Sequence, residues 1–320
     1  MKIHLLIKML RIKQGISQQI VSEGIMSRSA YSKFELGERA LTTFEFDAIM
    51  NRLDAHVSDL SDLENMEDSD SLKLRDLTYD LYYKKLDIDE VNNLYKEIEA
   101  KKENSIDTFR NYLVIKYRFT NHSKTIPPIS SEEVSELMDK IKEKEYLTNY
   151  YIQIIMDFTP IFSPEQLIYL LDRLKTYKID WISPIECQYM YILPGAISNI
   201  ADSLIDYAVI NTKKIDRSLL AYAEEACDKL SEIIELRPSL NCSLLLKLHR
   251  IRIEYYAGKN KKEKKEALTK AHKFKKELEF LVELKGYDDK KIETTADIAL
   301  NSINNLINQG KPGEIEYFFV

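Results

Sequence analysis

The sequence is poor in the two residues that most often interrupt helices. Glycine and proline occur eight times each in 320 residues, whereas an average protein of this length holds roughly 22 glycines and 16 prolines. We therefore expect long helices with short connections, and the composition excludes a collagen-like or low-complexity chain.

Long apolar runs are also missing, and none approaches the ~20 residues that a membrane-spanning helix needs. The segment Met1–Lys8 has charges within its apolar patch and no small-residue cleavage site, so we do not expect a signal peptide. The three cysteines, Cys187, Cys227 and Cys242, lack Cys-x-x-Cys spacing and are typical of buried thiols in a reducing compartment. We expect a cytoplasmic protein without membrane association.

Sequence motifs for catalysis are absent. The chain has no Gly-rich phosphate loop, no His-Glu-x-x-His and no Gly-x-Ser-x-Gly. Its five histidines lack the spacing of metal ligands; they are His4, His56, His122, His249 and His272. The sequence therefore predicts neither an enzyme nor a site for a metal or a cofactor.

The formal net charge of −6 argues against a protein that coats nucleic acid. Residues 1–52, however, carry eight Lys and Arg against five Asp and Glu, a local charge of +3. The remainder of the chain therefore carries −9. This asymmetry fits a small DNA-reading head on an acidic body.

Residues 15–37 are typical of two short helices joined by a tight turn. Ser17 and Ser27 each precede a helical segment, and their hydroxyls can cap its first turn. Gly24 supplies the turn, and Gly37 stands where the second helix should end in a left-handed conformation. The pattern predicts a helix-turn-helix.

The faces of these two helices differ in chemistry. We expect the first helix to bury Ile20 and Val21, and the second to turn Tyr31 and Phe34 inward. The opposite face of the second helix carries Arg28, Ser29, Ser32 and Lys33. These donors suit phosphate oxygens and base edges, and an α-helix fits the DNA major groove. Residues 27–36 are therefore the predicted recognition helix.

A helix hairpin whose polar face meets only water would show the same pattern, so the flanking segments matter. The apolar stripe in Leu5–Leu10 predicts a preceding helix that covers the pair. On that helix, Arg11 is placed to pair with Glu35. Thr42 and Glu45 have the spacing of a capping box that opens a fourth helix. All three features favour the helix-turn-helix.

Residues 18–37 form the motif Gln18-x-x-Val21-Ser-x-Gly-Ile-x-Ser-Arg-Ser-x-Tyr-Ser-Lys-Phe-Glu35-x-Gly37. This motif resembles the signature of the Rgg/GadR/MutR transcription regulators of Gram-positive bacteria. The stretch Phe46–Leu53 and residues 57–60 continue the resemblance, which covers about the first 65 residues. It implies a cytoplasmic regulator with a TPR-like helical repeat domain. In the wider Rgg/Rap/NprR/PlcR/PrgX group, that domain senses short signalling peptides.

On this interpretation the head contacts a double-stranded DNA operator. The residues expected to read bases or flanking phosphates are Arg28, Ser29, Ser32 and Lys33. Gln18, at a helix N-terminus, and Arg39, in the loop after the recognition helix, are expected to hold the DNA backbone. One head reaches only a few base pairs, so we expect a homodimer whose heads lie about 34 Å apart or a multiple of that distance.

The predicted fold is all-α, with an N-terminal helix-turn-helix domain followed by a TPR-like right-handed α-solenoid. The helix-turn-helix domain (the head) spans 1–65, an acidic linker 66–71, and the helical effector-binding and dimerisation domain (the body) 72–309. Roughly ten helices with short connections are typical of an α-solenoid. No fixed-period repeat is present, so a compact irregular bundle is the alternative. Residues 310–320 form a predicted C-terminal arm that docks on the body or a partner, or else is a disordered tail.

The body is also rich in side chains that suit peptides. Tyrosine rings supply contact area at low entropic cost, and amides can pair with a peptide backbone. The candidates are Tyr150, Gln153, Gln188, Tyr191, Asn199 and Asn241. Lys247, Arg250 and Arg252 are candidate anchors for a peptide carboxylate. For each residue alone, packing between helices or exposure to water is the alternative.

Lys259–Lys276 is strongly basic, and it is either a second DNA contact or a solvated helix face. Two other functions remain open. One is a ligand-independent plasmid- or phage-type repressor of the same architecture. The other is a helical scaffold that binds protein partners and uses its head only to dimerise.

Overall fold

The computed structural model describes residues 3–55, 70–82, 86–177, 189–210, 214–284 and 294–309. Every regular element in these ranges is helical, which confirms the predicted all-α class. Among the helices described, none has both the length and the apolar content to cross a membrane. The predicted arm at 310–320 and most of the predicted linker lie outside the described residues.

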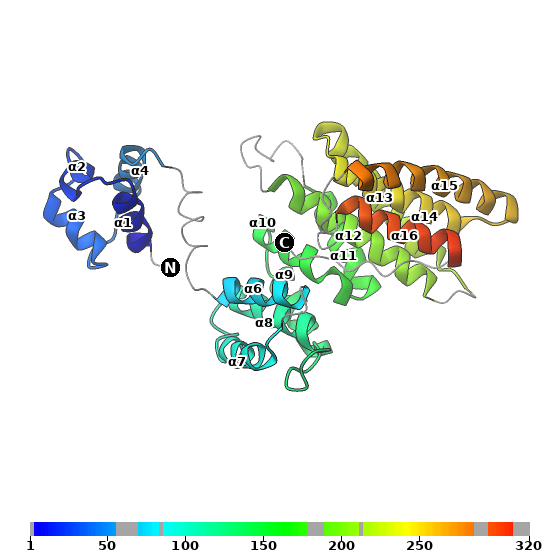
Figure 1. The fold of residues 1–320 in the computed structure, drawn as a ribbon, viewed down its shortest axis with the longest axis horizontal. Helices are drawn as coiled ribbons and strands as arrows, with labels where there is room; N and C mark the ends of the chain where they lie inside the picture. Colours follow the sequence, from blue (N-terminus) through cyan, green and yellow to red (C-terminus); the bar gives the residue numbers. More distant parts are fainter. Residues whose placement is uncertain are drawn as a thin grey trace. The chain divides into compact units, whose positions relative to one another are not determined.

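The described part of the head, residues 3–55, contains four short helices (Figure 1). They are α1 Ile3–Lys13, α2 Gln18–Ser22, α3 Arg28–Glu35 and α4 Thr43–Arg52. The predicted caps are present at α2, α3 and α4. The Ser17 and Ser27 hydroxyls each accept a backbone N–H at 3.2 Å, and Thr42 and Glu45 form a reciprocal capping box. Local sequence therefore determines where these three helices begin.

The head encloses its own hydrophobic core. Tyr31 and Phe34 of α3 are 0% and 1% exposed, as predicted, and they pack with Ile7 of α1 and Ile49 of α4. One side of each short helix faces this core, and α3 thereby keeps its opposite side free for other contacts.

Two apolar positions in the head do not lie where the sequence predicted. Ile20 is 54% exposed and Leu5 is 41% exposed. The five-residue helix α2 turns only one apolar side chain fully inward, and Val21 fills that place. On α1 the buried stripe runs through Ile7 and the partly buried Leu10, three residues apart, so Leu5 falls outside it.

The chain divides into two compact units, residues 1–128 and 129–320. Besides the head, the described residues of the first unit form three helices that pack against one another. They are α6 Asp70–Tyr82, α7 Ile88–Glu99 and α8 Ile106–Phe119. The domain boundaries proposed from the sequence remain a prediction.

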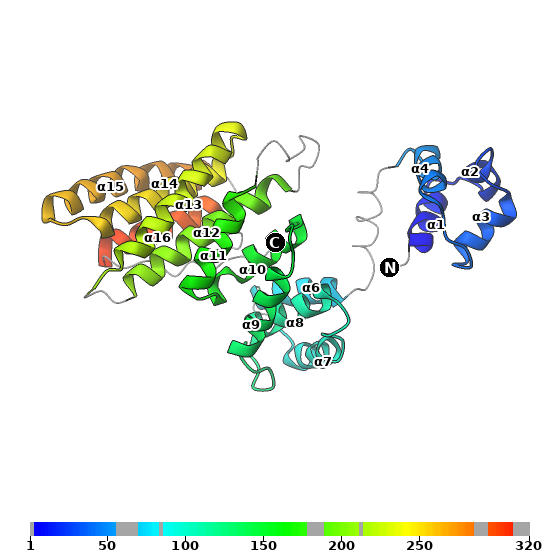
Figure 2. The same ribbon diagram turned by 180° about the vertical axis from the view of Figure 1, so that it is seen from behind.

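The second unit holds the remaining described helices. They are α9 Ser131–Lys142, α10 Asn149–Phe158, η1 Thr159–Ile161, α11 Pro164–Lys175, α12 Tyr189–Val209, α13 Arg217–Leu236, α14 Leu240–Ala257, α15 Lys261–Leu284 and α16 Thr295–Gln309. From α12 to α16, each helix packs against the next along the chain. In addition, α14 packs against both α12 and α16. Consecutive helices thus alternate between two layers, as in an α-solenoid (Figures 1 and 2).

A buried polar cluster joins α12 to α14. Arg252 of α14 is 0% exposed and donates to the carboxylates of Asp202 and Asp206 on α12. His249, one turn before Arg252, lies 2.9 Å from the Ser198 hydroxyl through its Nε2. A buried guanidinium needs such partners, because unpaired it would be strongly destabilising. Arg252 is therefore not the exposed carboxylate anchor that the sequence suggested.

Candidate nucleic-acid interface and effector surface

The outer face of α3 carries the predicted DNA-reading side chains together. Arg28, Ser29 and Lys33 are exposed, and Ser32 is half-buried. Within the described residues, neither the Arg28 nor the Lys33 side chain has a hydrogen bond or an ion pair, so both cations are available to an anion. These side chains lie on the outer face of α3, as the sequence predicted, because Tyr31 and Phe34 hold the other side of α3 in the core.

A polar network behind α3 fixes the position of this helix. The Arg11 guanidinium donates to both Glu35 carboxylate oxygens, at 2.6 and 3.0 Å, which confirms the predicted pair. Arg11 also donates to the Ile16 carbonyl at 2.7 Å, and the Gln18 amide donates to Glu35 at 2.7 Å. Burial alone would raise the pKa of Glu35. The hydrogen bonds from Arg11 and Gln18 nevertheless hold this pKa below its ordinary value. The carboxylate therefore stays charged and anchors α3.

Two predicted phosphate contacts already have partners inside the head. Gln18 donates to Glu35, as described above. Arg39 pairs with Glu45 at 2.6 Å, and Glu45 is also part of the capping box of α4. No sequence pattern indicated these partners, since they come from segments that only the fold brings together. A DNA role for Gln18 and Arg39 remains a prediction.

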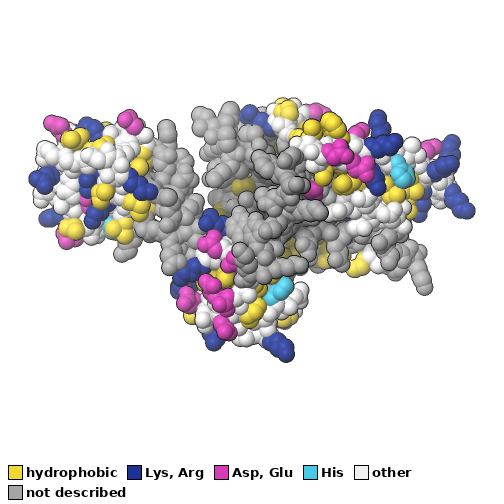
Figure 3. Space-filling model, viewed as in Figure 1, with side chains coloured by type: hydrophobic (Ala, Val, Ile, Leu, Met, Phe, Trp, Pro, Cys, Tyr) yellow, Lys and Arg dark blue, Asp and Glu magenta, His cyan; other side chains and the backbone are white. Residues whose placement is uncertain are grey.

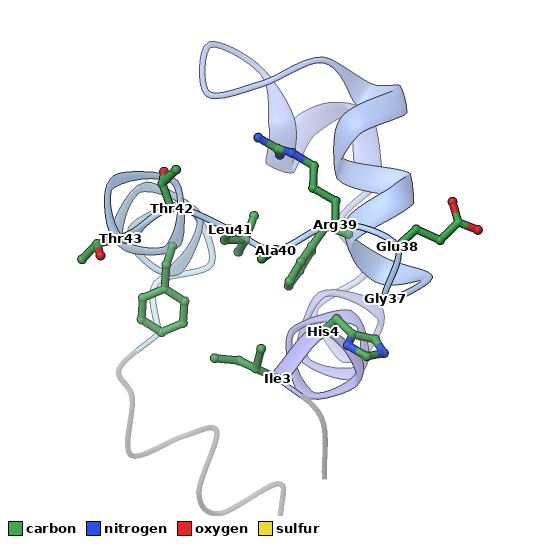
Figure 4. Close-up of a pocket in the computed structure, with 11 residues that line it drawn as sticks. Ile3, His4, Gly37, Glu38, Arg39, Ala40, Leu41, Thr42 and Thr43 are labelled. Carbon is green, nitrogen blue, oxygen red and sulfur yellow. The ribbon is translucent and has the colours of Figure 1, made fainter.

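A hollow of 720 Å³ opens on another part of the head, between the start of α1 and the loop from α3 to α4 (Figure 4). Arg39 is the one predicted DNA-contacting residue that lines it. The His4 ring lies edge-on to Phe34, with centroids 6.4 Å apart, and it also meets Gly37. A Cβ at Gly37, where φ is +79°, would lie 2.9 Å from that ring. The left-handed backbone therefore favours glycine at this end of α3, and an alanine there would also displace the His4 ring.

The candidate peptide-binding residues on α10 and α12 lie on helices that pack together. Tyr150 and Gln153 of α10 are half-buried. Asn199 of α12 donates to the Met156 carbonyl at 3.1 Å. Because Pro160 has no N–H, that carbonyl lacks the donor that a continuing helix would provide. Asn199 thus has a structural partner in the present arrangement.

The candidates on α14 are exposed or paired with neighbouring helices. Asn241 is exposed. Lys247 forms an ion pair with Glu277 of α15, and Arg250 lies 3.3 Å from Asp228 of α13. Exposed pairs of this kind contribute little free energy, so both cations can exchange partners at small cost.

Two further candidates cannot be placed with the others. Gln188 lies outside the described residues, and Tyr191 belongs to α12 but its side chain is outside them. Sequence reasoning also missed the cluster around Arg252. The sequence did contain a signal for this cluster, because Asp202 and Asp206 lie four residues apart on one face of an otherwise apolar segment.

Comparison with known proteins agrees with the two-part architecture. Residues 7–60 match the helix-turn-helix family, so the head is a helix-turn-helix domain. A search of curated protein sequences gives no match.

The fold of the chain as a whole resembles that of solved pheromone receptors. The SHP pheromone receptor Rgg2 from Streptococcus dysgalactiae matches with a TM-score of 0.57 at 15% identity, over 89% of this chain and 98% of that chain. A PrgX mutant matches with a TM-score of 0.60 at 14% identity, over 96% and 94%. The PrgX/iCF10 complex matches with a TM-score of 0.54 at 15% identity, over 94% and 95%. The Rgg resemblance seen in the head therefore extends to the fold of the whole chain.

Proposed function

We propose that this protein is a sequence-specific DNA-binding transcription regulator, that it acts as a homodimer, and that a short signalling peptide bound in the body controls it. The observation that carries the proposal is the outer face of α3. The Arg28 and Lys33 side chains stand exposed there and have no partner among the residues that the structure describes, while Arg11 and Glu35 fix the helix from behind.

The geometry of α3 suits the DNA major groove. Ser27 caps its N-terminus, and Arg28 follows directly. In helix-turn-helix proteins the N-terminal residues of the second helix contact base edges. Arg28 is suited to bidentate recognition of a guanine, and Lys33, one turn and a half further on, to a phosphate. Ser29 and Ser32 lie between them on the same face.

The peptide part of the proposal has independent support. Rgg2 is named as a pheromone receptor and PrgX forms a complex with iCF10, and both share the fold of this chain. Tyr150 and Gln153 of α10 and Asn199 of α12 lie on helices that pack together, and rings and amides of this kind can bind an extended chain. A peptide would regulate DNA binding only through unequal affinity for two conformations.

The DNA proposal is tested by selecting duplexes from a random library with the full-length protein. Enrichment of a motif with two half-sites spaced by about one helical turn, or a multiple of it, supports a dimeric reader. Retention of duplexes without any enriched motif overturns sequence-specific reading.

The peptide proposal is tested separately by incubating the protein with peptides from culture supernatant and measuring hydrogen exchange along the chain. Protection in α10 and α12, with a retained peptide identified by mass, supports it. Gln153→Ala should weaken retention, whereas Glu97→Ala, on the exposed side of α7, serves as the matched control. If no supernatant peptide is retained, the ligand-independent regulator is the better description.

A further inference from the structure

The helix α15 carries several exposed lysines on its solvent face. Its buried side is formed by Ala267, Ala271, Phe274 and Leu278. Successive residues of a helix are rotated by 100° about its axis, so the positions on the side opposite these four residues can be identified. Five of these positions are Lys261, Lys262, Lys265, Lys273 and Lys276, all of them exposed. We term these five residues the lysine stripe. The same face also holds Thr269, His272, Phe280 and Glu283. Figure 3 shows Lys and Arg side chains gathered over the end of this unit where α14 leads into α15.

The other lysines of α15 differ from the stripe because they have partners. Lys270 forms an ion pair with Glu254 at 2.6 Å, and Lys275 lies 3.7 Å from Glu279. Lys264 lies over the Tyr255 ring, 5.4 Å from its centroid. Within the described residues, the side chains of the five stripe lysines have no hydrogen bond, ion pair or ring contact. The fold therefore divides the lysines of one helix into a paired set and a free set.

Some of these free charges are unfavourable for the helix. Lys261 and Lys262 occupy the first turn of α15, where the helix dipole disfavours cations. Lys261 and Lys265, four residues apart, also repel each other. A partner that carries negative charge would relieve both effects, so the position of the stripe points to an anionic ligand.

We propose that the lysine stripe binds the phosphate backbone of duplex DNA outside the sequence that α3 reads. From Lys261 to Lys276 the stripe extends about 22 Å, which matches the rise of about six base pairs at 3.4 Å each. An anionic membrane fits less well, because a membrane-bound helix inserts an apolar face and the apolar face of α15 is already buried in the body. The inference rests on the proposed function, since DNA held by the head raises the local DNA concentration at the body.

The test measures binding of the full-length protein to a random-sequence 60-base-pair duplex at increasing salt. Lys265→Gln combined with Lys276→Gln should reduce the slope of log K against log salt by about 2, or about 1 for each lost phosphate contact. The matched control combines Lys96→Gln and Lys124→Gln, which removes two exposed charges from α7 and from the loop after α8. Its slope should equal that of the unchanged protein.

The result can be separated from failure of the head. If the stripe variant loses slope while Arg28→Ala leaves binding to a selected duplex unchanged, the lysine stripe is supported and reading by α3 is overturned. An unchanged slope in the stripe variant overturns the inference, whatever the head does. Tighter binding to phosphatidylglycerol vesicles than to DNA, lost in the same variant, also overturns it.

Discussion

Arg11 of α1 binds both carboxylate oxygens of Glu35 at the end of α3, at 2.6 and 3.0 Å. The pair is nearly buried, with 12% and 2% of the two side chains exposed. It joins the first helix of the head to the helix that carries the predicted DNA-reading face. The orientation of that face therefore depends on a nearly buried ion pair behind it.

Replacing Glu35 by Ala should destabilise the head by about 3 kcal/mol, because Arg11 would keep a mostly buried charge without its partner. Hydrogen exchange of amides in residues 3–55, measured in the full-length protein, gives the opening free energy of the head. Glu38→Ala removes an exposed carboxylate just after α3 and should leave exchange unchanged. Equal exchange in both variants would show that the Arg11–Glu35 pair does not stabilise the head.

Gly24 and Gly37 offer a matched pair of substitutions. Both have a left-handed backbone, with φ of +71° and +79°, but only at Gly37 would an added Cβ meet a neighbour within 4 Å, the His4 ring. Gly24→Ala should cost about 1 kcal/mol from backbone conformation alone, and Gly37→Ala should cost more. Thermal unfolding of the two variants tests this order. In a His4→Ala background the two costs should become similar, and a persistent difference would contradict the role given to His4.

His249 should make the stability of the body sensitive to mild acid. Burial lowers the pKa of His249 to about 4, so the folded state keeps the ring neutral while the unfolded state binds a proton below about pH 6.5. The contribution of His249 to stability is therefore lost as pH falls through this window, by about 2 kcal/mol from pH 7 to pH 5. Asp206, whose pKa burial raises to about 7, acts in the opposite direction. Urea unfolding followed by circular dichroism measures the loss. Relative to the unchanged protein, His249→Asn should lose less stability, or gain more, between pH 7 and pH 5. An equal change in both proteins would contradict neutral burial.

Local patterns were sufficient to predict most of the head. A cap depends on residues three apart, and Ser17, Ser27 and the pair Thr42 and Glu45 all cap as predicted. Exposure of Ile20 could not be predicted in the same way, because it depends on how short α2 becomes and which single side chain the core then accepts.

The body was predictable in class and much less so in detail. Helical spacing of apolar residues predicted the helices, but it does not specify which helices become neighbours. Arg252 illustrates the difference: its burial follows from the packing of α14 on α12, about 50 residues away along the chain. The partners of Lys247 and Arg250 depend on the same kind of long-range packing.

The most direct test of DNA reading by α3 is a titration of the selected duplex with full-length Arg28→Ala, compared with Lys13→Ala as a control on α1. Arg28→Ala should weaken binding by about 1–3 kcal/mol and relax the preference at one base position. Lys13→Ala should leave both unchanged. Unaltered affinity and unaltered base preference in Arg28→Ala would contradict the proposal that the exposed face of α3 reads DNA.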